Sequence, residues 1–213
     1  MRIVTALVTM AAPLALVMAP HAHGAECPDV ELIFARGTSE PAGAGRVGQA
    51  LANQLAPQLG GRTLGVYGVN YPATYDFLAA ADGAADATNR IAAMSQRCPS
   101  TRYVLGGYSQ GAAVVDMLVG IPPLGDKVGD VGSAPPLPAS LASRVAAVAV
   151  FGNPSAKFGR PVSIATTPFA GKGIDLCADG DPICSQGRNP FAHTSYEKTA
   201  LVGRAAGFVS AML

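Results

Sequence analysis

Two patterns of hydrophobic and polar residues alternate along the chain after its first 25 residues. Short apolar runs, most of them ending in glycine, proline or asparagine, are typical of buried strands and occupy residues 30–37, 63–72, 102–107 and 144–154. Between the strands, apolar residues at helical spacing or alanine-rich stretches predict helices over residues 46–59, 76–97 and 112–119.

This alternation predicts one α/β domain with a parallel sheet that helices cover on both faces. The continuous apolar run Val145–Phe151 suits a strand that is buried on both sides. Residues 122–140 are rich in proline and glycine, so we expect a connection over the surface and no domain boundary. A chain of 213 residues fits one domain more easily than two.

The N-terminus predicts a cleaved signal peptide. Residues 3–18 carry no charge, and Arg2 with the α-amino group supplies a minimal positive start. A retained membrane anchor is the alternative, but this stretch contains Pro13 and is shorter than the roughly 20 residues that a span needs. We therefore expect a signal peptide at residues 1–25 and a mature domain over residues 26–213, secreted and either free outside the cell or associated with the cell wall.

The composition excludes several kinds of partner. Charged residues make up only 14% of the chain, the net charge is +1 and no basic run occurs, so we expect no nucleic acid partner. Polar residues or prolines interrupt every later apolar run, so we expect no stable membrane insertion. Tryptophan is absent, which disfavours a platform for stacking sugars.

All four cysteines, Cys27, Cys98, Cys177 and Cys184, lie beyond the expected signal peptide. An even number in an exported chain favours two disulfides, with three possible connectivities. Cys177 and Cys184 are close enough to clip a short loop, and the other two would then close a long one. There is no C-x-x-C motif and only one histidine, His193, beyond the leader, so we expect no metal and no other cofactor.

The stretch GYSQG at residues 107–111 matches the G-x-S-x-G pattern of a nucleophile elbow, with Ser109 at its centre. About 0.2 chance matches are expected in a chain this rich in glycine, so the pattern alone is weak. Its context is stronger, because a predicted strand precedes Ser109 and a predicted helix follows it. A structural turn serine is the alternative.

A nucleophilic serine needs a general base, and His193 is the one histidine available to it. In α/β-hydrolases the order along the chain is serine, acid, histidine. Asp175, Asp179 and Asp181 precede His193, and position alone does not choose among them. The last two lie inside the loop that the closely spaced cysteines could close, where a disulfide could hold a carboxylate against the imidazole.

Three motifs, in this order along the chain, resemble the cutinase family, especially the cutinase-like exported esterases of actinobacteria. They are FARGTSEP at residues 34–41, GGYSQG at 106–111, and CADGDPIC at 177–184 followed by FAHTSY at 191–196. The resemblance covers about residues 26–205. It implies a small lidless α/β-hydrolase with a five-stranded parallel sheet flanked by helices and two disulfides, Cys27–Cys98 and Cys177–Cys184.

The resemblance also implies roles for single residues. It selects Asp181 as the acid of a triad with Ser109 and His193, and leaves Asp175 and Asp179 as solvated loop acids.

An oxyanion hole needs preorganised N–H donors. Gln110 follows the nucleophile and should supply one backbone N–H. By resemblance, Thr38 supplies the other, at a position where many cutinases have serine. Tyr71 and Pro72 also recur in relatives, and we interpret them as structural.

These residues predict a secreted serine carboxylic-ester hydrolase, a cutinase-like esterase or lipase. It would act as a monomer on a lipid or ester substrate with a short- to medium-chain acyl group, through an acyl-enzyme. One alternative is an acetyl ester hydrolase that acts on polysaccharide, which the lack of tryptophan mildly disfavours. The other is a non-catalytic secreted surface-binding protein on the same scaffold, which the intact serine, histidine and aspartate disfavour.

Overall fold

The computed structural model describes residue 1, residues 27–124 and residues 132–213. The expected signal peptide and residues 125–131 of the expected surface connection lie outside the described residues. Five parallel strands form one sheet in the order β2-β1-β3-β4-β5. The strands are β1 (Val30–Ala35), β2 (Leu64–Gly68), β3 (Arg102–Tyr108), β4 (Val145–Phe151) and β5 (Gly173–Leu176). The predicted parallel α/β sheet is therefore confirmed.

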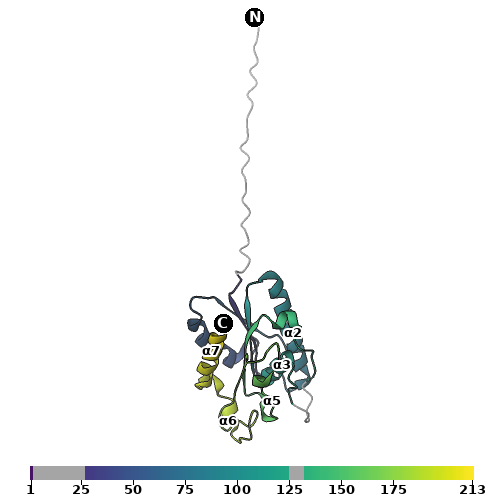
Figure 1. Cartoon of the computed structure of the whole chain (residues 1–213), viewed down its shortest axis with the longest axis vertical. Coiled ribbons are helices and arrows are strands. Elements are labelled where there is room, and N and C mark those ends of the chain that lie inside the picture. The colour runs from purple at the N-terminus through teal and green to yellow at the C-terminus, as the bar shows by residue number, and fades with distance from the viewer. Residues whose placement is uncertain (2–26, 125–131) are drawn as a thin grey trace.

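Helices cover both faces of the sheet (Figure 1). The α-helices are α1 (Gly45–Leu55), α2 (Ala80–Arg97), α3 (Gln110–Leu118), α4 (Ala139–Ala142), α5 (Pro154–Lys157), α6 (Pro190–His193) and α7 (Leu201–Met212). Short 3₁₀ helices are η1 (Ala56–Gln58), η2 (Phe77–Ala79), η3 (Val162–Ile164) and η4 (Tyr196–Lys198). One hydrophobic core joins the sheet to α2 and α3, and a second joins it to α1 and α7.

The apolar pattern located four strands and three helices correctly, with differences at their ends. The strand predicted over 63–72 ends earlier, at Gly68, and carbonyl groups that follow it accept hydrogen bonds from a buried arginine. Arg36 donates hydrogen bonds to the carbonyls of Val69 and Tyr71. The described residues between 122 and 138 form neither helix nor strand, as expected.

The pattern of residues did not locate β5, α7 or five short helices of three or four residues, α4, α5, α6, η3 and η4. β5 has only four residues, and three of them are half-buried, so its apolar signal is weak. The C-terminal helix α7 buries Val202, Ala205, Ala206 and Val209 on the sheet, at clear helical spacing.

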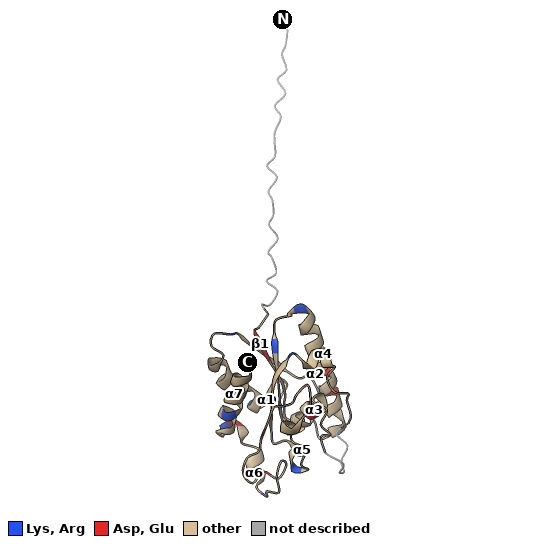
Figure 2. Cartoon of the chain, in the orientation of Figure 1, with Lys and Arg blue, Asp and Glu red and all other residues tan. Residues whose placement is uncertain are grey.

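Both implied disulfides are present, Cys27–Cys98 and Cys177–Cys184. The first joins the residues before β1 to the end of α2, and the second closes a loop after β5. Charged residues are scattered over the ribbon, which is mostly tan in Figure 2, as the low charge content predicts. Among the described residues, none of the helices has both the length and the apolar character needed to cross a membrane.

Candidate active site

Ser109 lies at the sharp turn between β3 and α3, as the elbow motif predicts. Its backbone has φ 56° and ψ −118°, a strained conformation for a residue other than glycine, with a cost of about 1–3 kcal/mol. A Cβ atom at Gly107 would lie 2.2 Å from the carbonyl oxygen of Gly111. A Cβ at Gly111 would lie 1.9 Å from the carbonyl oxygen of Ala35. Glycine is therefore required on both sides of the serine by close backbone packing.

The side chain of Ser109 meets His193, and His193 meets Asp181. Ser109 Oγ lies 2.8 Å from His193 Nε2, and His193 Nδ1 lies 2.8 Å from Asp181 Oδ2. Because an ionised carboxylate only accepts hydrogen bonds, Nδ1 carries the hydrogen of the neutral ring. Nε2 is then free to accept the hydrogen of the Ser109 hydroxyl group. The fold thus brings together three residues that the sequence and the family resemblance had selected.

Asp181 is fully buried, and its carboxylate accepts three hydrogen bonds. Oδ1 accepts from the backbone N–H of Ile183 at 2.7 Å, and Oδ2 accepts from His193 and from Tyr196 Oη at 2.6 Å. Burial acts to raise the pKa of Asp181, but these hydrogen bonds outweigh it and hold the pKa below its usual range. Asp181 is therefore a carboxylate at neutral pH.

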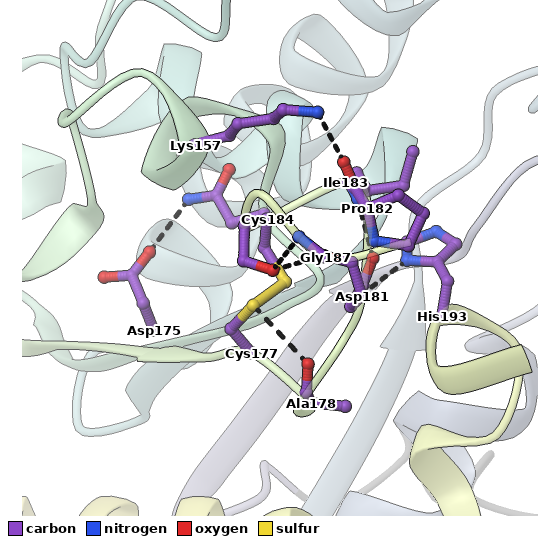
Figure 3. The surroundings of a disulfide bond; sticks show 12 residues. Lys157, Asp175, Cys177, Ala178, Asp181, Pro182, Ile183, Cys184, Gly187 and His193 are labelled. Carbon is purple, nitrogen blue, oxygen red and sulfur yellow. Dashed lines mark hydrogen bonds and ion pairs between the residues drawn. A yellow bond between two sulfur atoms is a disulfide. The ribbon is translucent and has the colours of Figure 1, made fainter. Parts of the chain in front are cut away.

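Asp181 and His193 belong to one irregular segment, residues 177–198, which we call the acid–base loop. The Cys177–Cys184 disulfide closes its first part, and Figure 3 shows Asp181 and His193 beside this disulfide. Two further hydrogen bonds hold the backbone around the acid. Lys157 Nζ donates to the carbonyl of Pro182 at 2.7 Å, and Ser185 Oγ donates to the carbonyl of Asp181 at 2.6 Å.

The two other candidate acids lie apart from the imidazole. Asp179 is exposed, as expected. The expectation that Asp175 is a solvated loop acid is wrong, because it lies in β5 and is half-buried. Asp175 accepts hydrogen bonds from Asn153 Nδ2 and from the backbone N–H of Ser163, both at 3.0 Å. It is engaged in a structural network, as Figure 3 shows for its bond to the neighbouring amide.

The two predicted oxyanion donors, Thr38 and Gln110, lie next to each other. Thr38 Oγ1 donates to Gln110 Oε1 at 3.1 Å. Gln110 is the first residue of α3, so its backbone N–H has no partner within the helix. The backbone N–H of Thr38 has no hydrogen-bond partner in the part of the chain that is described. Both amide groups are therefore available to a ligand.

The loop that contains Thr38 is held by Arg36, which is 6% exposed. In addition to its hydrogen bonds to the carbonyls of Val69 and Tyr71, its guanidinium group donates to the carbonyl of Glu40 at 2.9 Å. Tyr71 Oη donates in return to the carbonyl of Arg36, which agrees with a structural role for Tyr71.

Three residues that contact the histidine or the acid were not assigned a role from the sequence. Tyr196 binds Asp181, and Tyr108 Oη donates to the backbone carbonyl of His193 at 2.6 Å. Gly152 has φ 56°, and a Cβ there would lie 2.7 Å from His193 Cε1. Each residue lies inside or beside a recognised feature: Tyr108 in the elbow motif, Tyr196 in FAHTSY and Gly152 at the end of a predicted strand.

Five exposed apolar side chains, which we call the apolar rim, lie on two segments that either carry site residues or contact the loop of Thr38. They are Tyr75, Phe77, Leu78, Ile183 and Phe191. Ile183 and Phe191 are each two residues from the acid or the histidine. The segment with the other three starts at Ala73, whose carbonyl accepts from Ser39 N at 2.7 Å, next to Thr38.

Within the described residues, no group of three or more His, Cys, Asp or Glu side chains is placed to hold a metal ion. Both ring nitrogens of His193 are engaged by Ser109 and Asp181. Ser109 is partly exposed, so a substrate can reach its hydroxyl group.

A five-stranded parallel sheet with a serine at a strained strand-to-helix turn defines an α/β-hydrolase fold. The cutinase family model matches residues 26–213, and the chain belongs to the cutinase family. It is 49% identical over 196 residues to Phospholipase Culp4 of Mycobacterium tuberculosis, which covers 92% of this chain and 83% of that protein.

Two solved structures are similar in fold. A Trichoderma reesei cutinase in complex with a phosphonate inhibitor has a TM-score of 0.68 and 36% identity, over 87% of this chain and 77% of that one. The catalytic core domain of an acetyl xylan esterase from Trichoderma reesei has a TM-score of 0.71 and 26% identity, over 88% of this chain and 100% of that one.

Proposed function

We propose that this cutinase-family chain hydrolyses carboxylic esters through an acyl-enzyme formed on Ser109. His193 takes the hydroxyl proton as Ser109 Oγ attacks the ester carbonyl carbon, and Asp181 stabilises the imidazolium ion that results. The tetrahedral intermediate collapses, His193 returns the proton to the leaving alkoxide, and the alcohol departs. Water then attacks the acyl-enzyme with His193 as base, which releases the carboxylic acid and restores Ser109.

Negative charge develops on the carbonyl oxygen during both steps. The backbone N–H groups of Thr38 and Gln110 are the donors that would receive it. One such preorganised donor is worth about 3–4 kcal/mol of transition-state stabilisation. The Thr38 hydroxyl group is turned toward the Gln110 side chain, and this bond connects the two donor segments.

The observation that supports the proposal most directly is the continuous hydrogen-bonded set from Ser109 through His193 to a buried, ionised Asp181. A surface-binding protein on the same scaffold would have no use for the strained backbone at Ser109.

The Ser109→Ala variant tests the proposal. We expect hydrolysis of p-nitrophenyl butyrate to fall at least about 10⁴-fold, and labelling by a fluorophosphonate probe to disappear. Ser140→Ala, at an exposed serine of α4, is the matched control and should keep both activities. Full activity of Ser109→Ala would contradict the mechanism. Absence of any probe adduct on the wild-type protein would favour the non-catalytic binding role.

We further infer that the substrate is an ester with a short- to medium-chain acyl group. Ile183 and Phe191 support this inference, because exposed apolar side chains two residues from the acid and from the histidine favour an apolar acyl chain. Acetyl ester hydrolysis on polysaccharide is the second candidate, supported by the fold shared with an acetyl xylan esterase. Rates on a butyrate ester, a triglyceride emulsion, phospholipid vesicles and acetylated xylan would separate these candidates. A dominant rate on xylan would overturn the first.

We also infer that residues 1–25 are a signal peptide and that the mature domain is secreted. The apolar N-terminal stretch supports this, as does a family match that starts at residue 26. The mass of the protein recovered from culture medium should correspond to cleavage near Gly24 or Ala25. Retention of the whole chain in the cell membrane would contradict it.

A further inference from the structure

We propose that Tyr196 is a positioning residue for the reaction: its hydroxyl group binds the Asp181 carboxylate and sets how strongly that carboxylate holds the His193 imidazolium ion. The inference rests on the function proposed above and assigns a fourth residue to that site. Tyr196 does not touch Ser109 or a substrate, because its side chain is fully buried behind Asp181 and His193.

Tyr196 lies three residues after His193, at the start of η4. Its Oη atom lies 2.6 Å from Asp181 Oδ2, the same oxygen that binds His193 Nδ1 at 2.8 Å. The Tyr196 ring stands perpendicular to the imidazole, with ring centroids 6.2 Å apart and an angle of 88° between the planes. One carboxylate oxygen is therefore shared between the tyrosine and the histidine.

The direction of the Tyr196 hydrogen is fixed by a second bond. The backbone N–H of Ala178 lies 2.9 Å from Tyr196 Oη, and an N–H group can only donate. The phenol oxygen accepts there, and its own hydrogen goes to Asp181, because the carboxylate can only accept and is a stronger acceptor than the disulfide sulfur of Cys184, 3.4 Å away. Burial first, and then the neighbouring Asp181 carboxylate, raise the pKa of Tyr196 well above its ordinary value. The phenol therefore remains a donor throughout the working pH range.

A donated hydrogen bond stabilises the charge of a carboxylate and makes it a weaker partner for a second donor. During the reaction, Asp181 stabilises the imidazolium ion formed when His193 takes the Ser109 proton. Tyr196 moderates this stabilisation, so that Asp181 holds the imidazolium ion less strongly than a carboxylate without this bond would. At the same time it holds Asp181 at one place in a loop with little regular structure.

Other ionisable groups surround this cluster and remain unchanged in the test. They are Tyr108 of β3, Glu40 after β1, Arg46 of α1, Glu197 of η4 and Lys157 of α5. Arg46 pairs with both glutamates, at 3.3 Å to Glu40 and 4.0 Å to Glu197. Among the described residues, none of these groups is hydrogen-bonded to the Asp181 carboxylate, so Tyr196 is the ionisable group besides His193 that acts on it directly.

The test is the pH dependence of kcat/KM in Tyr196→Phe. Loss of the bond that holds Asp181 in place should lower kcat/KM about 10-fold, mainly through kcat, with KM little changed. The acid limb of the profile should move about half to one pH unit higher, because the freed carboxylate holds the imidazolium more tightly. Tyr103→Phe is the matched control. Tyr103 is also fully buried, and its Oη lies 3.2 Å from Ser95 Oγ of α2. The acid limb of the pH profile of Tyr103→Phe should not move.

A second variant keeps the packing and should move the acid limb of the pH profile in the opposite direction. Incorporation of 3-fluorotyrosine at Tyr196 retains the hydroxyl group and makes it a stronger donor, so the acid limb should move to lower pH. An unchanged acid limb in both the phenylalanine and the fluorotyrosine proteins would overturn the proposal.

A measurement without turnover separates this proposal from the proposed function. In the Ser109→Ala background, NMR follows the titration of the His193 ring, whose signal is assigned by its loss in His193→Gln. We expect the titration midpoint to rise on Tyr196→Phe. If Ser109→Ala stays active, the proposed function fails while this titration still tests Tyr196. If the midpoint does not move, the role of Tyr196 fails while the ester hydrolase stands.

Discussion

The two halves of the proposed active site are held in place by different means. Ser109 is fixed by backbone packing, between a strand and a helix that are almost wholly buried. His193 and Asp181 lie in the acid–base loop, whose helical pieces have three or four residues. Side chains and a disulfide hold that loop. The nucleophile is thus placed by the fold itself, and the base and acid by contacts added to it.

Each half also contains a buried carboxyl group, and the pKa values of the two are shifted in opposite directions. Asp181 accepts three hydrogen bonds, which hold its pKa below the usual range. Asp116 of α3 is fully buried, and burial raises its pKa well above the ordinary value despite a hydrogen bond from Asn153. The carboxylate that must be ionised therefore receives three hydrogen bonds, whereas burial shifts the pKa of Asp116 in the opposite direction.

The largest expected effect comes from crowding the elbow. In Gly111→Ala the new Cβ would lie 1.9 Å from the carbonyl oxygen of Ala35, so that α3 or β1 would have to shift. We expect a loss of stability of more than about 4 kcal/mol, so that little folded protein is recovered. Gly207→Ala in α7 is the control, since a Cβ there meets nothing within 4 Å. Normal yield and activity of Gly111→Ala, measured by thermal unfolding and p-nitrophenyl butyrate hydrolysis, would show that packing does not fix the nucleophile.

Removal of each of the two disulfides should affect activity and stability to different extents. Replacing Cys177 and Cys184 with serine loosens the loop around Asp181, so kcat/KM should fall about 10- to 100-fold. The free energy of unfolding should fall by only roughly 2–3 kcal/mol, because the closed loop is short.

The matched variant removes the Cys27–Cys98 bridge, which lies at the start of β1 and spans 71 residues of sequence. This longer loop predicts a larger loss of stability, roughly 4 kcal/mol, with kcat/KM of the folded protein little changed. Thermal unfolding and kinetics on the two double-serine variants measure both quantities. Equal losses of activity would remove the distinction between the two halves.

The same contrast explains how far the sequence could predict the structure. Strands β1, β3 and β4 and the elbow have continuous apolar runs and a motif that depends on backbone sterics, so local patterns were sufficient. The short strand β5 has no such signal. The expectation of a loop acid at Asp175 was therefore wrong, since this residue lies in β5 and is hydrogen-bonded to Asn153.

The acid–base loop depended on resemblance and chain order. The choice among Asp175, Asp179 and Asp181 could not be made from position, because the answer lies in contacts between distant segments. Tyr108 and Tyr196 reach this loop through side-chain hydrogen bonds that no periodicity predicts. Residues fixed by backbone packing can be predicted from the sequence, whereas those fixed by tertiary side-chain contacts need the structure.

The smallest expected effect sharpens the comparison between the two carboxyl groups. In the folded state, Asp116 Oδ1 accepts from Asn153 Nδ2 at 3.1 Å, and Oδ2 has no partner among the described residues. An asparagine has the same shape and can keep the acceptor at Oδ1. We therefore expect Asp116→Asn to retain kcat/KM within about threefold, whereas Asp181→Asn should lose about 10⁴-fold in kcat.

The raised pKa of Asp116 also predicts how the stability of Asp116→Asn relative to the wild type changes with pH. Because the folded-state pKa of Asp116 is raised, the unfolded chain releases this proton at a lower pH than the folded protein does. The contribution of Asp116 to stability is therefore lost as pH rises from about 4 through the raised value, and an asparagine avoids that loss. At pH 8 we expect Asp116→Asn to be more stable by about 1 kcal/mol, or roughly 2–4 °C in Tm, with the difference disappearing near pH 4. A Tm difference that is constant with pH would mean that Asp116 is ionised in the fold. The buried carboxyl groups of the two halves would then both be charged.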